Sequence, residues 1–361
     1  MVKVGENLFY NNCLYTDDIK DSMLTGAFSL GLLRGCSVLI TGASGLIGSF
    51  LVDALLLCND LGSLNLEVYA MSRNRVSLEK RFRSHLQNPH LHILEHDVSL
   101  PLDCSYSVDY IVHAASNAYP RLYSTDPVGT IMGNVWGAYN LLQYGKKCGS
   151  RRLLFVSSGE VYGQGSKGIS SFDESYSGYV DSTNPRSCYP NGKRAAETLC
   201  VSFTKQYTLD TVIARPCHIY GPTMTANDNR VSAQFVNNAL AGTDIVMKSQ
   251  GLQLRSYCYV ADCVSAIMTI LLRGETANAY NISNPNSVIT IREMAEIVAG
   301  ISGTKVVFKQ PDEDEKGERN PVRRSVLKSD KLESLGWQAK YNMERGMRKT
   351  LGIMRGSKVN C

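Results

Sequence analysis

The chain has 361 residues, of which 43% are hydrophobic and 20% charged, so it has ample material for one large folded domain and a smaller one. Its formal net charge of +5 is small for this length, and no run of five or more like charges occurs. These properties argue against a surface for nucleic acid or anionic membranes, although they permit a basic pocket for a small anion.

The first residues, MVKVGENLFYNN, lack the basic start and continuous apolar stretch of a secretory signal. The apolar stretch 26–40 is too short and too interrupted to span a bilayer. Eleven cysteines are scattered without a CxxC pair or a metal-ligand pattern, which fits free thiols in a reducing compartment. We therefore expect a soluble cytoplasmic protein without a metal site.

From Cys36 onward, short β-rich runs alternate with longer helical patterns. Strands are expected over residues 37–41, 66–72, 91–98, 108–116, 152–158 and 209–216, and helices over 45–57, 134–149 and 191–207. Strands that alternate with helices form parallel βαβ units. The pattern predicts an α/β fold with a Rossmann-type, doubly wound parallel sheet.

The rhythm changes after Tyr220. Gly221-Pro222 indicates a loop, and the expected elements that follow are helices over 231–241, 261–272 and 290–302, a strand within 242–248, and an exposed charged loop over 311–321. Thr290 with Glu293 three residues later is the pattern of a helix N-cap. We expect an N-terminal extension without an assignable motif (1–35), a dinucleotide-binding domain (36–220) and a smaller, partly interleaved substrate domain (221–361). A segment near 255–285 is expected to return to the Rossmann domain.

The sequence TGASGLIG directly follows the first strand and opens the first helix. Its glycines, Gly42, Gly45 and Gly48, permit a tight turn, close approach of a pyrophosphate and close helix packing. Backbone N–H groups at the helix start then bind the phosphates. In this context the glycine pattern predicts a dinucleotide site.

The residues after the second strand bear on the choice of dinucleotide. Ser72 and Arg73 stand where an acidic residue would bind the ribose hydroxyls of NAD, and an arginine there accommodates the 2′-phosphate of NADP. This favours NADP over NAD. We expect further cofactor contacts from residues at the ends of the other strands and at the start of the first helix, namely Thr41, Leu46, Ile47, Asp97, Val98, Ala114, Ala115 and Pro216.

A candidate catalytic group lies further along the chain. Tyr189 and Lys193 are four residues apart, so both project from one face of the expected helix. A nearby ammonium lowers the pKa of a tyrosine, which makes it a better base. Ser158, at the end of the fifth strand, is placed to orient a substrate oxygen.

With these motifs, the sequence resembles the extended short-chain dehydrogenase/reductase family, in its nucleotide-sugar epimerase and dehydratase branch, and most nearly the UDP-glucuronate decarboxylases. The resemblance runs from about Val38 to Thr350, and the segments that carry it are 113–127, 160–163, 186–199, 219–231, 255–264, 320–324 and 335–337. It implies a homodimer that acts on a nucleotide-diphosphate sugar through a 4-keto intermediate, in nucleotide-sugar metabolism.

The resemblance also implies roles for single residues. Tyr189 would take the proton of the sugar 4-hydroxyl, Ser158 would hydrogen-bond the reacting oxygen, and Lys193 would bind the nicotinamide ribose; both Tyr189 and Lys193 would also contact the cofactor. Glu160 would act at carbon 5 or hydrogen-bond a sugar hydroxyl. Contacts to the nucleotide sugar are implied for Asn117, Asn227, Arg230, Arg255 and Arg324.

Two positions depart from the family pattern. Gly159 stands where dehydratases have an aspartate and decarboxylases a serine or threonine, which weakens the dehydratase assignment strongly and the decarboxylase assignment appreciably. A glycine there is expected to make room for a bulkier or differently oriented sugar. Leu327 replaces a usual aspartate, which puts the contact at that position in doubt.

Several reactions stay open at this point. A redox-neutral decarboxylase is favoured by overall similarity, a 4-epimerase is an alternative, and Arg73 with Gly159 keeps an NADPH-dependent 4-keto sugar reductase in view. A cofactor-binding protein without catalysis is disfavoured by the presence of Ser158, Tyr189 and Lys193.

Overall fold

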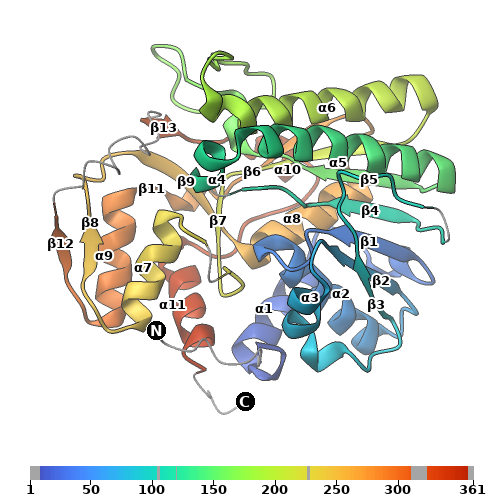
Figure 1. Ribbon diagram of the computed structural model, residues 1–361. Coiled ribbons are helices and arrows are strands. Elements are labelled where there is room, and N and C mark those ends of the chain that lie inside the picture. Colours follow the sequence, from blue (N-terminus) through green and yellow to red (C-terminus); the bar gives the residue numbers. More distant parts are fainter. Residues whose placement is uncertain (1–8, 104–105, 119, 226–227, 310–322, 357–361) are drawn as a thin grey trace.

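The structure, a computed structural model, describes residues 9–103, 106–118, 120–225, 228–309 and 323–356. Its centre is a seven-stranded parallel sheet in the order β10-β6-β5-β4-β1-β2-β3 (Figure 1). The strands are β1 (Ser37–Thr41), β2 (Glu67–Ser72), β3 (Leu91–Glu95), β4 (Tyr110–His113), β5 (Arg152–Val156), β6 (Thr211–Pro216) and β10 (Ala279–Ile282). The order reverses between β1 and β4, so the carboxyl ends of these two strands flank a crevice.

Helices cover both faces of this sheet, as the buried strands require. In β1, Val38 and Ile40 pack into one core while Leu39 packs into the other, because successive side chains of a strand point to opposite faces. The first core also holds side chains of α2 (Leu46–Gly62) and α8 (Val260–Arg273). The second is covered by α5 (Pro127–Cys148) and α6 (Cys188–Tyr207), which lie side by side in Figure 1. The predicted Rossmann-type, doubly wound sheet is confirmed.

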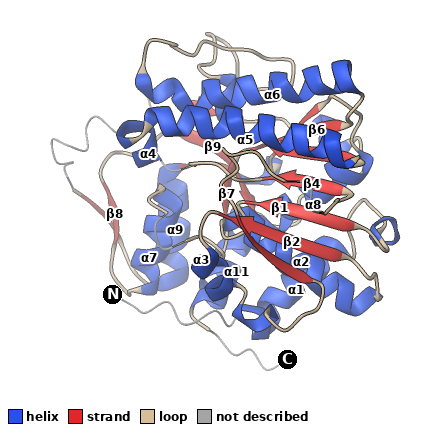
Figure 2. Cartoon of the chain, turned by 45° about the vertical axis from the view of Figure 1, so that its right-hand side comes forward, coloured by secondary structure: helices blue, strands red, loops and turns tan. Residues whose placement is uncertain are grey.

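A second group of elements lies beyond the carboxyl edge of the sheet (Figure 2). It contains α7 (Val231–Leu240), α9 (Ile291–Ser302) and α11 (Met343–Met354). Its strands are β7 (His218–Tyr220), β9 (Leu254–Tyr259), β11 (Val288–Thr290) and β13 (Arg324–Ser325) in one sheet, and β8 (Ile245–Met247) with β12 (Val306–Phe308) in another. The Thr290–Glu293 capping box is present at the start of α9, as predicted. Between these elements the chain returns to the large sheet, where β10 pairs with β6.

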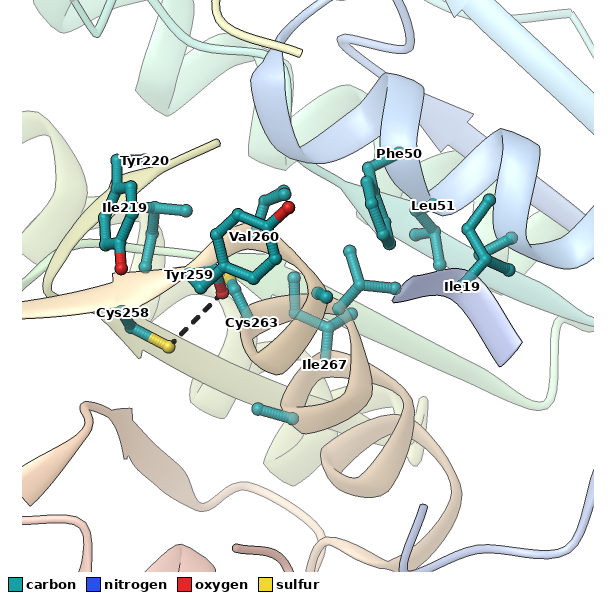
Figure 3. Close-up of a cluster of buried hydrophobic side chains, with 14 of the residues drawn as sticks. Ile19, Phe50, Leu51, Ile219, Tyr220, Cys258, Tyr259, Val260, Cys263 and Ile267 are labelled. Carbon is teal, nitrogen blue, oxygen red and sulfur yellow. Dashed lines mark hydrogen bonds between the residues drawn. The ribbon is translucent and has the colours of Figure 1, made fainter. Parts of the chain in front are cut away.

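The N-terminal region contains a helix that the sequence patterns did not predict. Helix α1 (Cys13–Met23) buries Ile19 against Phe50 and Leu51 of α2 and Ile267 of α8 (Figure 3). Its polar residues are buried as well: the Tyr15 hydroxyl donates to Asp53 at 2.6 Å, and Asp18 accepts from Tyr259 at 2.6 Å. This helix has polar residues on its buried face, so hydrophobic periodicity did not indicate it.

Other elements differ from the expectations at their ends. The strands expected over 91–98, 108–116 and 152–158 end earlier, at Glu95, His113 and Val156, and the residues that follow them are in loops or short turns at the carboxyl edge of the sheet. The shorter helices α3 (Arg75–Arg81), α4 (Pro120–Thr125) and α10 (Asp330–Glu333) complete the fold. The predicted loop 311–321 lies outside the described residues.

Two expectations about the chain as a whole can be compared with the structure. No helix within the described ranges is long and apolar enough to cross a lipid bilayer. Eight cysteines in these ranges have free thiols, whereas Cys13 is disulfide-bonded, which departs from the expectation of a free thiol at that residue.

Candidate active site

The glycine-rich turn joins β1 to α2 at the crevice. Gly42 has φ +67°, and a Cβ there would lie 2.7 Å from the backbone nitrogen of Ala115. A Cβ at Gly48 would overlap the carbonyl oxygen of Gly42. Gly45 caps the 17-residue helix α2, and all three glycines line a cavity of about 200 Å³. A helix N-terminus that follows a glycine-rich turn fits a dinucleotide pyrophosphate.

The floor of this cavity is fixed by a hydrogen-bond chain from β1 to β4. The Thr41 hydroxyl accepts the backbone N–H of Ala115 at 3.2 Å and lies 2.8 Å from Nδ1 of His113. Burial, with a contribution from the Lys193 charge, lowers the pKa of His113 to about 3, so the ring that shares this hydrogen bond with Thr41 is neutral. Thr41 therefore supports the Ala114–Ala115 segment from below, and Ala114 lines the cavity.

The predicted adenosine-side residues lie at the ends of β2 and β3. Arg73 is exposed, and its guanidinium is 3.5 Å from the side-chain oxygen of Asn117. Asp97 accepts the Ser99 hydroxyl at 2.7 Å. Against the effect of burial, hydrogen bonds from Ser99 and the nearby Arg73 charge lower the pKa of Asp97. Ser72 accepts the backbone N–H of Asn74 at 3.2 Å, and the Val98 carbonyl accepts from an α5 asparagine.

The predicted catalytic side chains converge on the inner end of the cavity. Tyr189 is 6% exposed, and its hydroxyl hydrogen-bonds with Ser158 and with Tyr123, whose ring stacks on it at 4.7 Å. Lys193, one turn further along α6, is 2% exposed and donates from Nζ to the carbonyl of Val156 at 2.8 Å. Pro216, Leu46 and Ile47 line the same cavity.

The electrostatics of Tyr189 differ from the expectation. Burial and the Glu160 carboxylate raise the pKa of Tyr189, although its hydrogen bonds with Ser158 and Tyr123 oppose that rise. Burial also lowers the pKa of Lys193 to about 7, so its ammonium charge is only partly present at neutral pH. Lys193 therefore does not supply the expected lowering of the tyrosine pKa, and the groups that favour the phenolate are Ser158, the Arg230 charge and Tyr123.

Leu327 lies next to the position that a side chain at Gly159 would occupy. A Cβ on Gly159 would lie 3.0 Å from Cδ1 of Leu327, and Leu327 is buried with Val161, Tyr162 and Phe172. Leu327 therefore borders the position that a Cβ at Gly159 would take, while Gly159 itself lines the first cavity; the expectation that this glycine makes room for a larger sugar stays a prediction.

Glu160 follows Gly159 in a short 3-10 turn (Gly159–Tyr162) and lines two cavities. Burial raises the pKa of its carboxyl, and the charges of Arg186 and Arg255 oppose the rise.

The second cavity, of about 360 Å³, adjoins the first and shares Tyr123, Glu160, His218 and Arg230 with it. Three guanidinium groups, from Arg186, Arg230 and Arg255, line this second cavity. Arg230 is ion-paired with Asp228 at 2.5 Å, and Arg255 is 4% exposed. Arginines supply the planar, bidentate donors that a diphosphate requires.

Two of the expected substrate residues, Asn117 and Arg324, do not line either cavity. Arg324 is exposed and reaches the Ser170 carbonyl at 3.4 Å, and it does not line either cavity; Asn117 faces Arg73 instead. Asn227 lies outside the described residues.

Three residues of the site were not identified from the sequence: Tyr123, Arg186 and His218. Tyr123 comes from α4, far from Tyr189 in the chain, and no local pattern connects the two. Arg186 lies three residues before Tyr189, so its closeness in the chain was a usable signal, whereas His218 lies just after the strand expected over 209–216 and belongs to no motif.

Comparison with known proteins places this site in a family. The model of the NAD dependent epimerase/dehydratase family matches residues 38–283. The chain belongs to this family. Similar relatives are UDP-glucuronic acid decarboxylase 6 of Arabidopsis thaliana, 36% identical over 310 residues covering 86% of both chains, and UDP-glucuronic acid decarboxylase 1 of Xenopus tropicalis, 32% identical and covering 88% of this chain and 72% of that one. The fold matches a dTDP-glucose 4,6-dehydratase of Streptomyces venezuelae crystallised with NAD, with a TM-score of 0.74, 25% identity and coverage of 89% and 98%.

Membership in the NAD dependent epimerase/dehydratase family identifies the protein as an enzyme of the extended short-chain dehydrogenase/reductase type, which depends on NAD or NADP. The family match spans the glycine turn, Tyr189 and Lys193, and ends at the last strand of the large sheet.

Proposed function

We propose that the protein converts a nucleotide-diphosphate sugar through a 4-keto intermediate, with NAD(P) bound along the glycine turn. The observation that carries the proposal is the junction of the two cavities. Tyr189, Ser158 and Lys193 lie on the cofactor side, and Glu160 and three arginines lie on the other. A sugar held by its diphosphate at the arginines would present its ring to Tyr189.

The bound nicotinamide would accept and return a hydride at the sugar carbon. The protein's own part is to move a proton and hold atoms in line. Tyr189 would take the hydroxyl proton, Ser158 would hydrogen-bond the same oxygen, and Lys193 would hold the cofactor ribose. Replacing Tyr189 by phenylalanine is expected to abolish turnover while the protein still binds NAD(P)H; unchanged turnover would exclude Tyr189 as the base.

For the net reaction, we propose first the decarboxylation of UDP-glucuronate, which is supported by the similarity to UDP-glucuronic acid decarboxylases. The absence of a hydroxyl at Gly159 argues against this reaction, so the test must be direct. Release of carbon dioxide from UDP-glucuronate with only trace cofactor is the expected result. A clean epimer product without carbon dioxide would instead favour the 4-epimerase.

The second candidate is a reductase of 4-keto nucleotide sugars that consumes NADPH. Exposed Arg73, beside the ends of β2 and β3, supports it because a guanidinium there can bind a 2′-phosphate. NADPH absorbance would then fall in proportion to the 4-keto substrate reduced. Arg73→Ala should weaken NADPH binding by about one to two orders of magnitude and leave NADH binding unchanged, since one charge-assisted contact contributes roughly 1.5–3 kcal/mol.

A variant of Glu160 can distinguish reactions that involve carbon 5 of the sugar from reactions that involve only carbon 4. Glu160→Gln keeps the size of the side chain but removes its basicity. We expect it to block any reaction at carbon 5 while oxidation at carbon 4 continues, visible as reduced cofactor in a single turnover. Full turnover by the variant would assign Glu160 to sugar binding.

We also propose that two copies pair through α5 and α6. Along α5, the exposed side chains of Val128, Met132 and Trp136 are spaced four residues apart and so form one stripe, and Val201 of α6 is exposed on the neighbouring helix. A charged residue introduced into this stripe should prevent the two copies from pairing. Sedimentation of the native protein as a dimer and of Trp136→Asp as a monomer is the expected result, and a native monomer would contradict it.

A further inference from the structure

His218 lies where the cofactor cavity meets the arginine-lined cavity, and it lines both. It is the first residue of β7 and pairs in register with Tyr257 of β9, whose ring is 5.5 Å away. The other ionisable side chains that line both cavities are Tyr123, Glu160 and Arg230, and Arg186 and Arg255 line the second cavity beside them. The roles proposed above make no use of this imidazole.

The hydrogen bonding of His218 fixes which ring nitrogen carries a proton. Its Nδ1 lies 3.3 Å from the backbone carbonyl oxygen of Ser256. Because a carbonyl oxygen only accepts, Nδ1 must be the donor, and in a neutral ring Nε2 then has a lone pair. Burial, followed by the charges of Arg255 and Arg230, lowers the pKa of His218 to about 3, so the ring is neutral at any pH at which the enzyme would work.

A neutral ring with this tautomer restricts the group it can bind. The lone pair of Nε2 repels phosphate oxygens, which are also acceptors, whereas it attracts a hydroxyl hydrogen. The neighbouring guanidiniums of Arg186, Arg230 and Arg255 already provide donors for a diphosphate. The complementary group for His218 is therefore a sugar hydroxyl.

We infer that His218 accepts a hydrogen bond at Nε2 from a hydroxyl group of the bound sugar and so contributes to the choice among nucleotide sugars. The inference rests on the proposed function, because it requires a sugar in the junction. A site that hydrogen-bonds a hydroxyl discriminates against analogues that lack it, since its own buried polar atom is then left unpaired. His218 is in this sense a specificity-determining residue.

The test compares ligands with and without the sugar. Calorimetry on the NAD(H)-loaded protein would measure binding of UDP-glucuronate, UDP-glucose and dTDP-glucose, and of free UDP and dTDP. His218→Phe keeps a flat ring but removes the acceptor, and should weaken the sugar nucleotide about three- to tenfold, the range expected for one neutral hydrogen bond, while the free diphosphate binds as before. His218→Gln retains an acceptor oxygen and should recover part of the loss.

The remaining outcomes separate the possible failures. Equal weakening of free diphosphate and sugar nucleotide by His218→Phe would identify a phosphate contact and overturn the inference, as would no weakening at all. A loss that appears only below pH 6 would mean a protonated imidazole and would overturn it too. If the native protein binds none of the sugar nucleotides but does bind NAD(H), the proposed function fails, and this inference falls with it.

Discussion

Gly159 and Leu327 form a contact whose energetics can be measured. Alanine at Gly159 adds one methyl group whose carbon would lie 3.0 Å from Cδ1 and 3.5 Å from Cδ2 of Leu327. Leu327 is 3% exposed, so it must shift within a packed cluster by a few tenths of an ångström. Overpacking of this kind costs about 1–3 kcal/mol, and we expect the lower end because the contact is only slightly too short.

The opposite change removes the obstructing side chain. Leu327→Ala deletes buried methyl groups beside Val161 and Phe172 and should cost about 2–4 kcal/mol. In the double variant the new methyl at Gly159 enters the space that Leu327 vacates. The double variant should then be destabilised by about 1 kcal/mol less than the sum of the two single variants, which is within the range of coupling seen between contacting residues.

Urea unfolding of the four proteins, followed by circular dichroism, measures this coupling. A matched control is Gly133→Ala in helix α5, where an added Cβ meets no atom within 4 Å. It should be neutral or stabilising by up to about 1 kcal/mol because alanine favours helix, and its effect should add to that of Leu327→Ala. The contact would be refuted if Gly159→Ala changed the free energy of unfolding no more than the control does, and if its effect added fully to that of Leu327→Ala.

Three further predictions follow from buried polar groups and close contacts. In the unfolded chain the Lys193 ammonium keeps its proton to about pH 10, whereas in the folded protein it releases the proton at about pH 7. Between these pH values the group therefore makes the free energy of unfolding rise with pH. Lys193→Met should make the urea midpoint less dependent on pH in that window and should raise the midpoint at pH 7. Gly48→Ala should lower the melting temperature and abolish NAD(P)H fluorescence enhancement, because its Cβ would overlap the Gly42 carbonyl; retained cofactor binding would contradict the close approach. Asp18→Ala should cost about 3–5 kcal/mol, since it leaves the Lys349 ammonium, now 2.8 Å from the carboxylate, without its partner; a change below 1 kcal/mol in chemical unfolding would show that α1 contributes little.

The sequence itself determined the features that depend on neighbours in the chain. The glycine spacing after a β-rich run, the four-residue step from Tyr189 to Lys193 and the polar residues after β5 are all local patterns, and the backbone geometry of a turn, a helix and a strand translates them directly into positions. The doubly wound parallel sheet followed because alternating helices and strands permit few topologies.

Only the tertiary structure decided the features that join distant segments. Tyr123 stacks on Tyr189, Leu327 fills the space beside Gly159, and His218 meets the Ser256 carbonyl across β7 and β9. The direction of the Tyr189 pKa shift also depends on the tertiary structure. Burial raises the pKa of Tyr189, and burial also lowers the pKa of Lys193, so that the lysine carries only part of its charge. Packing and desolvation are sums over everything that surrounds a group in space, and most of those surroundings come from elsewhere in the chain.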